Sequence, residues 1–237
     1  NLSYLGDTDG IFETYDFGVN TQDNRNYFVQ ITKRGGFLLT INSNAFNADN
    51  NQNNNSENVN QNDNLQQDLQ NEKLEQEKKD STKDESEVVK AESINNVTST
   101  TKKAVEKALS FANKLNLENM ECVWSASSQE VCFINLAPVI DDIVMYPDVV
   151  KVKVDLTSNS VIGWEASSYA YNHIEREDLI PQLTETEAKA LVSSKLQIDN
   201  VRLCVIPLDY VGETLSYEFE GKYNDYTYYL YIDAYTG

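Results

Sequence analysis

The only histidine of the sequence stands beside a run of acidic residues, and this arrangement has the clearest potential for chemistry. His173 precedes Glu175, Glu177 and Asp178. A histidine activated by a carboxylate can act as a general base, and clustered carboxylates can bind a cation. No nucleophile stands at a motif spacing around it, and a metal site with several histidines is excluded by the count. We therefore predict a structural role for His173, as a hydrogen-bonding residue within or between units of the fold.

A second acidic group could bind calcium. Asp141 and Asp142 are adjacent, and Asp148 follows shortly after. The Asp-x-Asp-x-Asp-Gly spacing of calcium loops is absent, so we interpret the pair as a solvated hairpin tip. Two carboxylates could also serve a glycosidase, but with 38 Asp and Glu some pair meets that distance by chance. The sequence therefore predicts no catalytic, cofactor-binding or metal-binding residue.

Three cysteines are too few for a disulfide scaffold, and their odd number leaves at least one unpaired within the chain. If Ala126–Ser128 is a hairpin turn, Cys122 and Cys132 face one another across two strands. Directly opposed strand residues fit disulfide geometry poorly. Cys122 and Cys204 also fall on positions where apolar residues recur, so we predict that the cysteines are buried small hydrophobic residues.

Tyrosine is concentrated near the end of the sequence, where Tyr226, Tyr228, Tyr229 and Tyr231 crowd one predicted strand. Strand alternation sends Tyr226 and Tyr228 to one face and Tyr229 and Tyr231 to the other. A sheet covered by a helix on one side needs only one apolar face. The second row then needs a neighbouring unit, another protein or a glycan as its partner. These four tyrosines are the candidate partner-binding residues.

Charge and hydropathy exclude several functions. The chain of 237 residues carries 19 Lys and Arg against 38 Asp and Glu, a formal net charge of −19. Such an excess opposes binding to nucleic acid or to an anionic membrane surface. The longest apolar runs, Leu136–Ile140 and Tyr228–Ile232, are too short to span a bilayer. The sequence opens without a basic and apolar leader, so we interpret it as a mature or truncated piece whose targeting signal lies outside it.

A segment of low complexity interrupts the chain. Ten of the eighteen residues from 47 to 64 are Asn, and Gln, Glu, Lys, Asp and Ser continue to about residue 92 without any aromatic residue, Gly, Pro or Cys. Such a composition cannot bury enough apolar surface to offset the entropy of ordering. We predict that residues 47–97 form a disordered insert or linker.

A repeated pattern of one helix and three strands follows the insert. The apolar spacing over 100–115 predicts a one-faced helix, and strands are expected at 119–124, 131–135 and 149–154. A second helix opens at Thr184, which with Glu187 forms a predicted capping box, and its expected apolar face is Ala188, Leu191, Val192 and Leu196. Its strands are expected at 200–205, 215–220 and 226–232.

The N-terminal residues repeat the strands without the helix. Thr14–Phe17 parallels Ser216–Phe219, and 27–31 parallels the third strand. Five residues after each third strand stands Gly36, Asn159 or Gly237, residue types that accept a left-handed turn conformation. We predict a partial first unit at 1–46 and complete units at 98–180 and 181–237. Because small units are marginally stable alone, we expect them to pack on one another.

The helix opened by Thr184–Ala188, with a third strand ending in Tyr231–Gly237, resembles the PepSY domain. A longer set of segments is similar to YpeB-type spore germination proteins: 146–154, 162–166, 171–173, 201–207 and 217–223. The similarity covers 98–237 well and 1–45 moderately, and the Asn-rich insert departs from the family pattern. The fold implied is α+β, with tandem PepSY-like repeats that each pack a helix on a three- to four-stranded antiparallel sheet, the first repeat being truncated.

The resemblance implies binding rather than catalysis, without a cofactor. Proteins of this family have an N-terminal membrane anchor, absent from this chain, and are needed for the stability of a SleB-type spore-cortex-lytic transglycosylase. The expected location is extracytoplasmic in the spore, at the outer face of the inner spore membrane or the cortex. One alternative is a PepSY-type inhibitor of a protease or hydrolase. Another is a cell-wall protein that binds or hydrolyses glycan.

Overall fold

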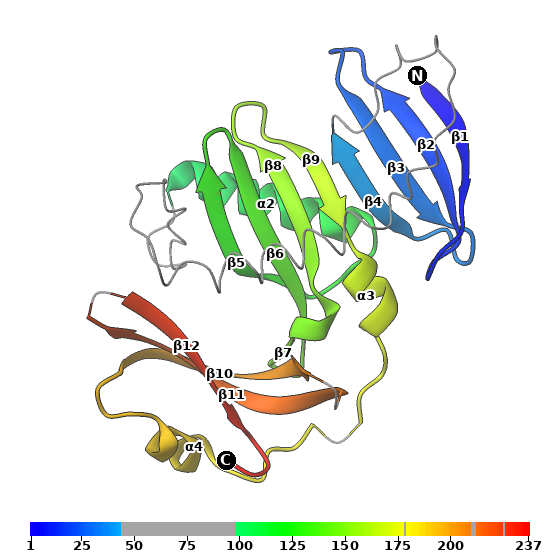
Figure 1. Cartoon of the computed structure of the whole chain (residues 1–237). Coiled ribbons are helices and arrows are strands. Elements are labelled where there is room, and N and C mark those ends of the chain that lie inside the picture. Colours follow the sequence, from blue (N-terminus) through cyan, green and yellow to red (C-terminus); the bar gives the residue numbers. More distant parts are fainter. Residues whose placement is uncertain (44–97, 178, 210–211, 225) are drawn as a thin grey trace, which may run out of the picture. The chain divides into compact units, whose positions relative to one another are not determined.

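The computed structural model describes residues 1–43, 98–177, 179–209, 212–224 and 226–237 (Figure 1). The predicted insert at 47–97 and Asp178 lie outside the described residues. The strands are β1 (Leu2–Thr8), β2 (Thr14–Asn20), β3 (Asn26–Thr32), β4 (Leu38–Ser43), β5 (Met120–Ser128), β6 (Val131–Ile140), β7 (Ile143–Met145), β8 (Val150–Asp155), β9 (Ser160–Glu165), β10 (Gln197–Leu208), β11 (Gly212–Tyr223) and β12 (Tyr226–Asp233). The helices are α2 (Ser99–Lys114), α3 (Ser167–Asn172) and α4 (Glu185–Leu191), and a 3-10 turn, η2, covers Tyr146–Asp148.

The twelve described strands form one hydrogen-bonded sheet in the order β1-β2-β3-β4-β9-β8-β6-β7-β10-β11-β12, with β5 paired to β6. Neighbouring strands are antiparallel except β7 and β10, which run parallel. The structure is therefore mostly sheet with few helices, which confirms the coarser part of the predicted fold class. We call β1–β4 the N-terminal segment, residues 98–177 the central segment and residues 179–237 the C-terminal segment. Whether domain boundaries fall at 46, 97 and 180 stays a prediction.

Helix α2 covers the sheet of the central segment (Figure 1). It begins after Thr98, whose side chain accepts a hydrogen bond from the Thr101 backbone N–H. The predicted apolar face is confirmed, and its innermost positions are Ala104, Ala108 and Ala112, each 0% exposed. Because alanine is small, the helix backbone can lie close to the valines and Trp164 of the sheet.

The strand predicted from strict alternation, β8, has the expected burial. Val150, Val152 and Val154 are buried, whereas Lys151 and Lys153 face solvent. The period of two in side-chain direction explains this pattern. The valines of β8 join the core under α2, so this strand connects a simple sequence pattern to the main hydrophobic cluster.

The helix of the C-terminal segment is shorter than predicted. The capping box of Thr184 and Glu187 is present. Ala188 is fully buried as expected. Leu191 is 58% exposed and α4 ends there, so Val192 and Leu196 lie beyond the helix and the predicted apolar face is wrong at these three positions. Val192 is extended and is followed by Ser193 and Ser194; the β-branched residue and the serines disfavour further helix. A full helix on each sheet is therefore not found in this segment.

The predicted turn after each third strand is confirmed. Gly36, Asn159 and Gly237 have φ of 65°, 49° and 89°, the left-handed region that these residue types accept. In two of the turns an aspartate, Asp155 or Asp233, accepts hydrogen bonds from backbone N–H groups of the turn. These bonds from the turn backbone lower the pKa of the Asp155 carboxyl.

The segments join by adding strands to one another. The N-terminal segment joins the central one through antiparallel β4 and β9, and Trp164 Nε1 donates to the Leu38 carbonyl at 3.2 Å. Strand β6 pairs with β8 through Val131–Leu136 and with β7 through its last two residues, Val139 and Ile140. Strand β7 then pairs with β10 of the C-terminal segment.

The alanine face of α2 gives a first prediction. Replacing Ala108 by leucine adds three carbons where the helix meets the sheet, and we expect the free energy of unfolding to fall by about 1–3 kcal/mol. The same change at Ser110, which is exposed on α2, should cost less than about 0.5 kcal/mol. Urea unfolding of both variants measures the difference, and equal costs would contradict the close packing of α2.

Candidate functional site

A short turn of the central segment, next to the C-terminal segment, carries polar contacts to two buried carboxylates. Tyr146, Pro147 and Asp148 form η2, where the fixed φ of proline favours the tight turn. The turn directly follows β7, which the parallel pairing with β10 holds against the C-terminal segment. Tyr146 contacts one polar cluster and Asp148 another. The two clusters together are called the polar junction here.

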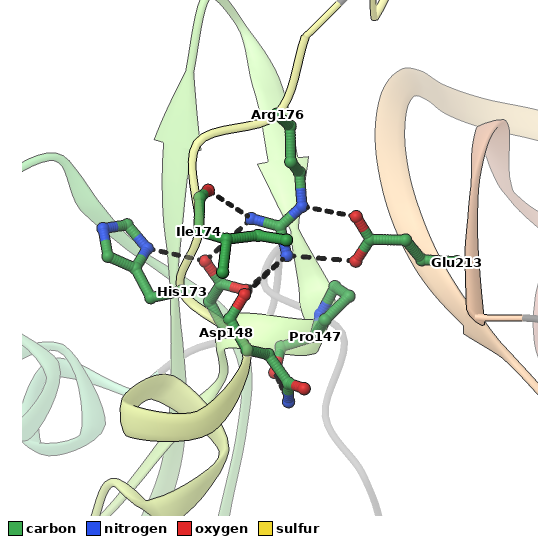
Figure 2. Close-up of polar contacts among 7 residues, drawn as sticks. Pro147, Asp148, His173, Ile174, Arg176 and Glu213 are labelled. Atoms are coloured by element: carbon green, nitrogen blue, oxygen red, sulfur yellow. Dashed lines mark hydrogen bonds and ion pairs between the residues drawn. The ribbon is translucent and has the colours of Figure 1, made fainter.

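The first cluster is centred on Asp148, which is 0% exposed. Figure 2 shows its carboxylate between His173 and Arg176. His173 Nδ1 lies 2.7 Å from Oδ2, and the Arg176 guanidinium donates to both carboxylate oxygens, at 2.7 and 3.1 Å. The same guanidinium donates to Glu213 at 2.7 and 3.1 Å, so it connects the central segment to β11.

This cluster is strongly held by its charges. The Arg176 side chain is 5% exposed. Burial by itself would lower the pKa of this guanidinium, but hydrogen bonds to Glu213 and Asp148 outweigh it and raise the pKa, so the group stays charged. The Asn172 side chain donates to the Pro147 carbonyl at 2.8 Å. The bidentate bonds of Arg176 fix the geometry of the cluster as well as its charge balance.

A stack of rings continues this cluster toward the N-terminal segment. The His173 ring stacks on Tyr169 of α3, with centroids 4.3 Å apart. Tyr169 in turn stacks on Phe37, just before β4, at 5.9 Å. A continuous set of side-chain contacts therefore runs from Phe37 through Asp148 to Glu213 and involves all three segments.

The second cluster lies around Glu218, a carboxylate that is only 2% exposed in the middle of β11. Tyr146 donates its hydroxyl to Glu218 at 2.6 Å, and Arg202 of β10 donates to the other oxygen at 2.7 Å. Arg202 also lies over the Tyr146 ring, 5.6 Å from its centroid. Burial and the bond to Glu218 raise the pKa of Tyr146, so its hydroxyl remains a donor.

The four predicted tyrosines all lie on β12 and are exposed, from 42% at Tyr229 and Tyr231 to 68% at Tyr226. Their distribution over two faces is seen in their contacts. Tyr231 meets Tyr146 edge-on at 6.4 Å, and Tyr229 donates to Glu220 at 3.3 Å, while Tyr228 lies beside Tyr223. Burial, with the charge of Glu220, raises the pKa of Tyr229 to about 12. The row of Tyr229 and Tyr231 therefore extends the Glu218 cluster, and both rings still expose part of their surface.

The histidine prediction is confirmed in its hydrogen-bonding role. Its hydrogen-bond partner is Asp148, whereas Glu175 and Glu177, which follow it in the sequence, are exposed. The acidic pair Asp141 and Asp142 forms the exposed turn between β6 and β7 with positive φ at both residues, as the hairpin-tip interpretation predicts. These acids do not converge with Asp148, and no potential metal-binding group of three or more His, Cys, Asp or Glu occurs among the described residues.

Cys122 and Cys132 do not face one another, because the condition of a turn at 126–128 is not met. The β5–β6 turn falls at Gln129 and Glu130 rather than at 126–128, so Cys122 pairs with Leu136 and Cys132 with Ser127. The three cysteines of the described chain are free thiols. Cys132 and Cys204 are 0% exposed, which confirms the buried hydrophobic interpretation for these two.

Sequence reasoning missed four of the residues that build the polar junction: Arg176, Arg202, Glu213 and Glu218. A signal was available for two of them. Arg202 and Glu218 each interrupt an apolar or aromatic strand, and in the structure they are paired directly across β10 and β11. Charged residues in the interior of strands are usually compensated by a partner when they are buried.

Comparison with known proteins agrees with this architecture. Residues 86–179 match the family model described as the YpeB sporulation PepSY1 and PepSY2 domains. Residues 182–237 match the model described as the peptidase propeptide and YPEB domain, or PepSY. The chain carries YpeB-type PepSY domains. The tandem PepSY organisation predicted from the sequence is thereby confirmed.

Curated relatives extend this finding. The sporulation protein YpeB of Halalkalibacterium halodurans is 36% identical over 134 residues, which are 56% of this chain and 30% of that protein. YpeB of Bacillus subtilis is 31% identical over 133 residues, 55% of this YpeB-type chain and 30% of the relative. The matched region thus spans less than a third of each relative.

The Bacillus megaterium YpeB C-terminal domain is similar in fold. Its TM-score is 0.69 at 21% identity, with 100% of this chain and 85% of that chain covered. The YpeB-type chain therefore has the fold of a YpeB C-terminal domain. In the parts of the chain that the structure describes, no helix is long and apolar enough to cross a membrane.

The polar junction gives a second prediction. Changing Arg176 to methionine leaves Asp148 and Glu213 without their cation, and we expect the free energy of unfolding to fall by about 3–5 kcal/mol. Arg25, paired with Asp23 at an exposed site, is the matched control, and its methionine variant should lose far less stability, because exposed ion pairs contribute little. Adding Asp148→Asn to Arg176→Met should recover part of the loss, because it removes the uncompensated charge. Equal costs at the two arginines in urea unfolding would refute this role.

The thiols give a third prediction. Burial raises the pKa of all three thiols, and with the charge of Glu218 it raises that of Cys204 to about 12. Access to the reagent therefore decides between them, because Cys132 and Cys204 are 0% exposed whereas Cys122 is partly exposed. Since the thiolate is the reactive form, a disulfide reagent at pH 8 should modify the partly exposed Cys122 first. The other two thiols should react only after unfolding in urea. Cys204→Ala serves as the control and should leave the fast phase unchanged; rapid modification of two or more thiols in the native chain would contradict the burial.

Proposed function

We propose that the chain acts in spore germination by binding and holding a spore-cortex-lytic transglycosylase of the SleB type in the dormant spore, without catalysing a reaction itself. The relatives are sporulation proteins by name, and the family is the basis for the sporulation role. Stabilising or restraining that enzyme is the finer part of the proposal. The binding surface consists of sheet faces and edges, among them the tyrosines of β12.

One observation carries the proposal. The two buried carboxylates of the polar junction, Asp148 and Glu218, are each paired with an arginine of their own segment. The bonds from Arg176 to Glu213 and from Tyr146 to Glu218 join the central segment to the C-terminal segment. A general acid or base would instead need a group free to exchange a proton with substrate. The tyrosines of β12, in contrast, expose ring surface that can contact a protein.

The proposed location is extracytoplasmic, at the outer face of the inner spore membrane or in the cortex. The relatives are much longer than the matched region, so we place the membrane attachment in an N-terminal anchor of the full-length protein. The acidic chain itself is unsuited to an anionic lipid surface, since its net charge is −19. The tandem segments, which share one hydrogen-bonded sheet, would extend from that anchor toward the cortex.

A second candidate is an inhibitor that covers the active site of a protease or hydrolase. The description of the matched C-terminal family, peptidase propeptide, favours this reading. Stabiliser and inhibitor differ in one respect: an inhibitor lowers the activity of its partner when bound. A cell-wall protein that binds glycan through the exposed tyrosines, or hydrolyses it, is the third candidate.

Purified chain and purified cortex-lytic transglycosylase provide the test. We expect binding by calorimetry, a longer half-life of the enzyme at elevated temperature, and no release of sugar fragments from purified cortex by the chain alone. A basic muramidase of unrelated fold controls for attraction to an acidic protein. Loss of enzyme activity on binding would favour the inhibitor, fragment release by the chain would favour the hydrolase, and absence of binding would refute the proposal.

A further inference from the structure

Three strands of the described sheet pair on one side only, and two of them have irregular edges. Strand β1 has a register shift between Tyr4 and Gly6. Strand β5 has one between Cys122 and Trp124. Such bulges twist an edge and prevent another strand from pairing with it.

Strand β12 has none of these protections. Its eight residues pair with β11 without a register shift. The strand contains no lysine, arginine or proline, and its only charged residue is Asp233 at the end. Half of its eight side chains are exposed tyrosines, with Tyr226, Tyr228, Tyr229 and Tyr231 all at 42% or more. A long, regular and aromatic edge of this kind favours the addition of a further strand.

The N-terminal and central segments each have a further strand at the position that corresponds to the outer edge of β12. In the N-terminal segment the strand before the left-handed turn, β3, has a further strand, β4, on its outer side. In the central segment β8 has β9 in the same place. Strand β12 is the equivalent strand of the C-terminal segment, and the described residues place no strand on its outer side. The pairings β4–β9 and β7–β10 also show that this protein joins its segments by strand addition.

Charge indicates what kind of strand the edge receives. Residues 181–237 contain nine Asp and Glu and four Lys and Arg, a net charge of −5. A second copy of the chain would bring the same negative charge, and the whole chain carries −19. A basic, extended segment has the complementary charge, and complementary charge also speeds association.

We infer that the outer edge of β12 binds an extended, positively charged segment of the partner protein, which pairs with the β12 backbone as an added strand between the tyrosine side chains. This inference rests on the proposed function, because it names the surface through which the cortex-lytic enzyme is held. Tyrosines on both faces of β12 provide ring surface on either side of the added strand.

Hydrogen exchange of the full chain, with and without the purified lytic enzyme, tests the backbone pairing. Addition of a strand should slow exchange of the outward-facing amides of Tyr226–Asp233 by about tenfold or more. The equivalent peptide of β1, Leu2–Thr8, is the edge control and should not change. Binding of the enzyme with unchanged exchange on β12 would overturn the inference and leave the proposed function intact. Absence of enzyme binding by the native chain would overturn both.

Two substitutions of opposite charge at Tyr228 test whether the bound segment is positively charged. Tyr228 is 43% exposed and pairs with Gly221, so neither replacement meets a charged residue directly across β11. We expect Tyr228→Lys to weaken binding of the enzyme about tenfold or more, and Tyr228→Glu to weaken it by clearly less. Tyr171→Lys, at a residue of α3 that is 68% exposed, is the control and should bind like the native chain.

The alternative occupants have their own outcomes. Equal weakening by both Tyr228 variants would show that charge does not select the segment and would overturn the basic partner. A dimer of the native chain in sedimentation that Tyr228→Lys dissociates would assign the edge to a second copy instead. Thermal unfolding of each variant confirms that a change in binding does not come from a loss of folding.

Discussion

The carboxylate of Asp148 is completely buried, and a buried carboxylate is tolerated only where charge and hydrogen bonds compensate its lost hydration. Arg176 supplies the charge and two of the bonds, and it reaches Asp148 only because the chain after α3 passes over η2. The same guanidinium holds Glu213. This one cation therefore connects β11 to the central segment, in addition to the pairing of β7 with β10.

A second buried carboxylate works in the same way on the other side of η2. Glu218 takes one bond from Tyr146 of the turn and one from Arg202 of the neighbouring strand. Buried ion pairs contribute little net stability compared with apolar packing, but an unpaired member is costly. Two such pairs at one turn accordingly disfavour other arrangements of the segments. A sheet whose segments are held in one arrangement is consistent with the proposed binding function.

The edge strands of the described sheet differ in whether a further strand can pair with them. Bulges in β1 and β5 prevent further pairing there, while β4, β7, β9 and β10 use their edges to join segments. The tyrosine-rich β12 combines a regular edge with large aromatic side chains that lose little conformational entropy on binding. Natural sheets usually carry bulges, charges or prolines at exposed edges that prevent pairing, so an edge without them indicates a contact with another molecule. The net negative charge of residues 181–237 favours a positively charged partner, a preference that an apolar edge alone would lack.

The sequence by itself determined the elements that depend on local patterns. The alternation in β8, the alanine and leucine spacing of α2, the capping box of Thr184 and the left-handed turns at Asn159 and Gly237 all follow from residues close in the chain. The hydrogen-bonding role of His173 was foreseeable because the sequence offers no nucleophile at motif spacing and no second histidine, whereas its partner Asp148 was not. Only the tertiary structure decided that Arg176 meets Asp148 and Glu213, because these residues are far apart in sequence and nothing local sets their distance. The same holds for the edges: which strand lies outermost depends on the order of all strands in the sheet, and that order is fixed by long-range packing.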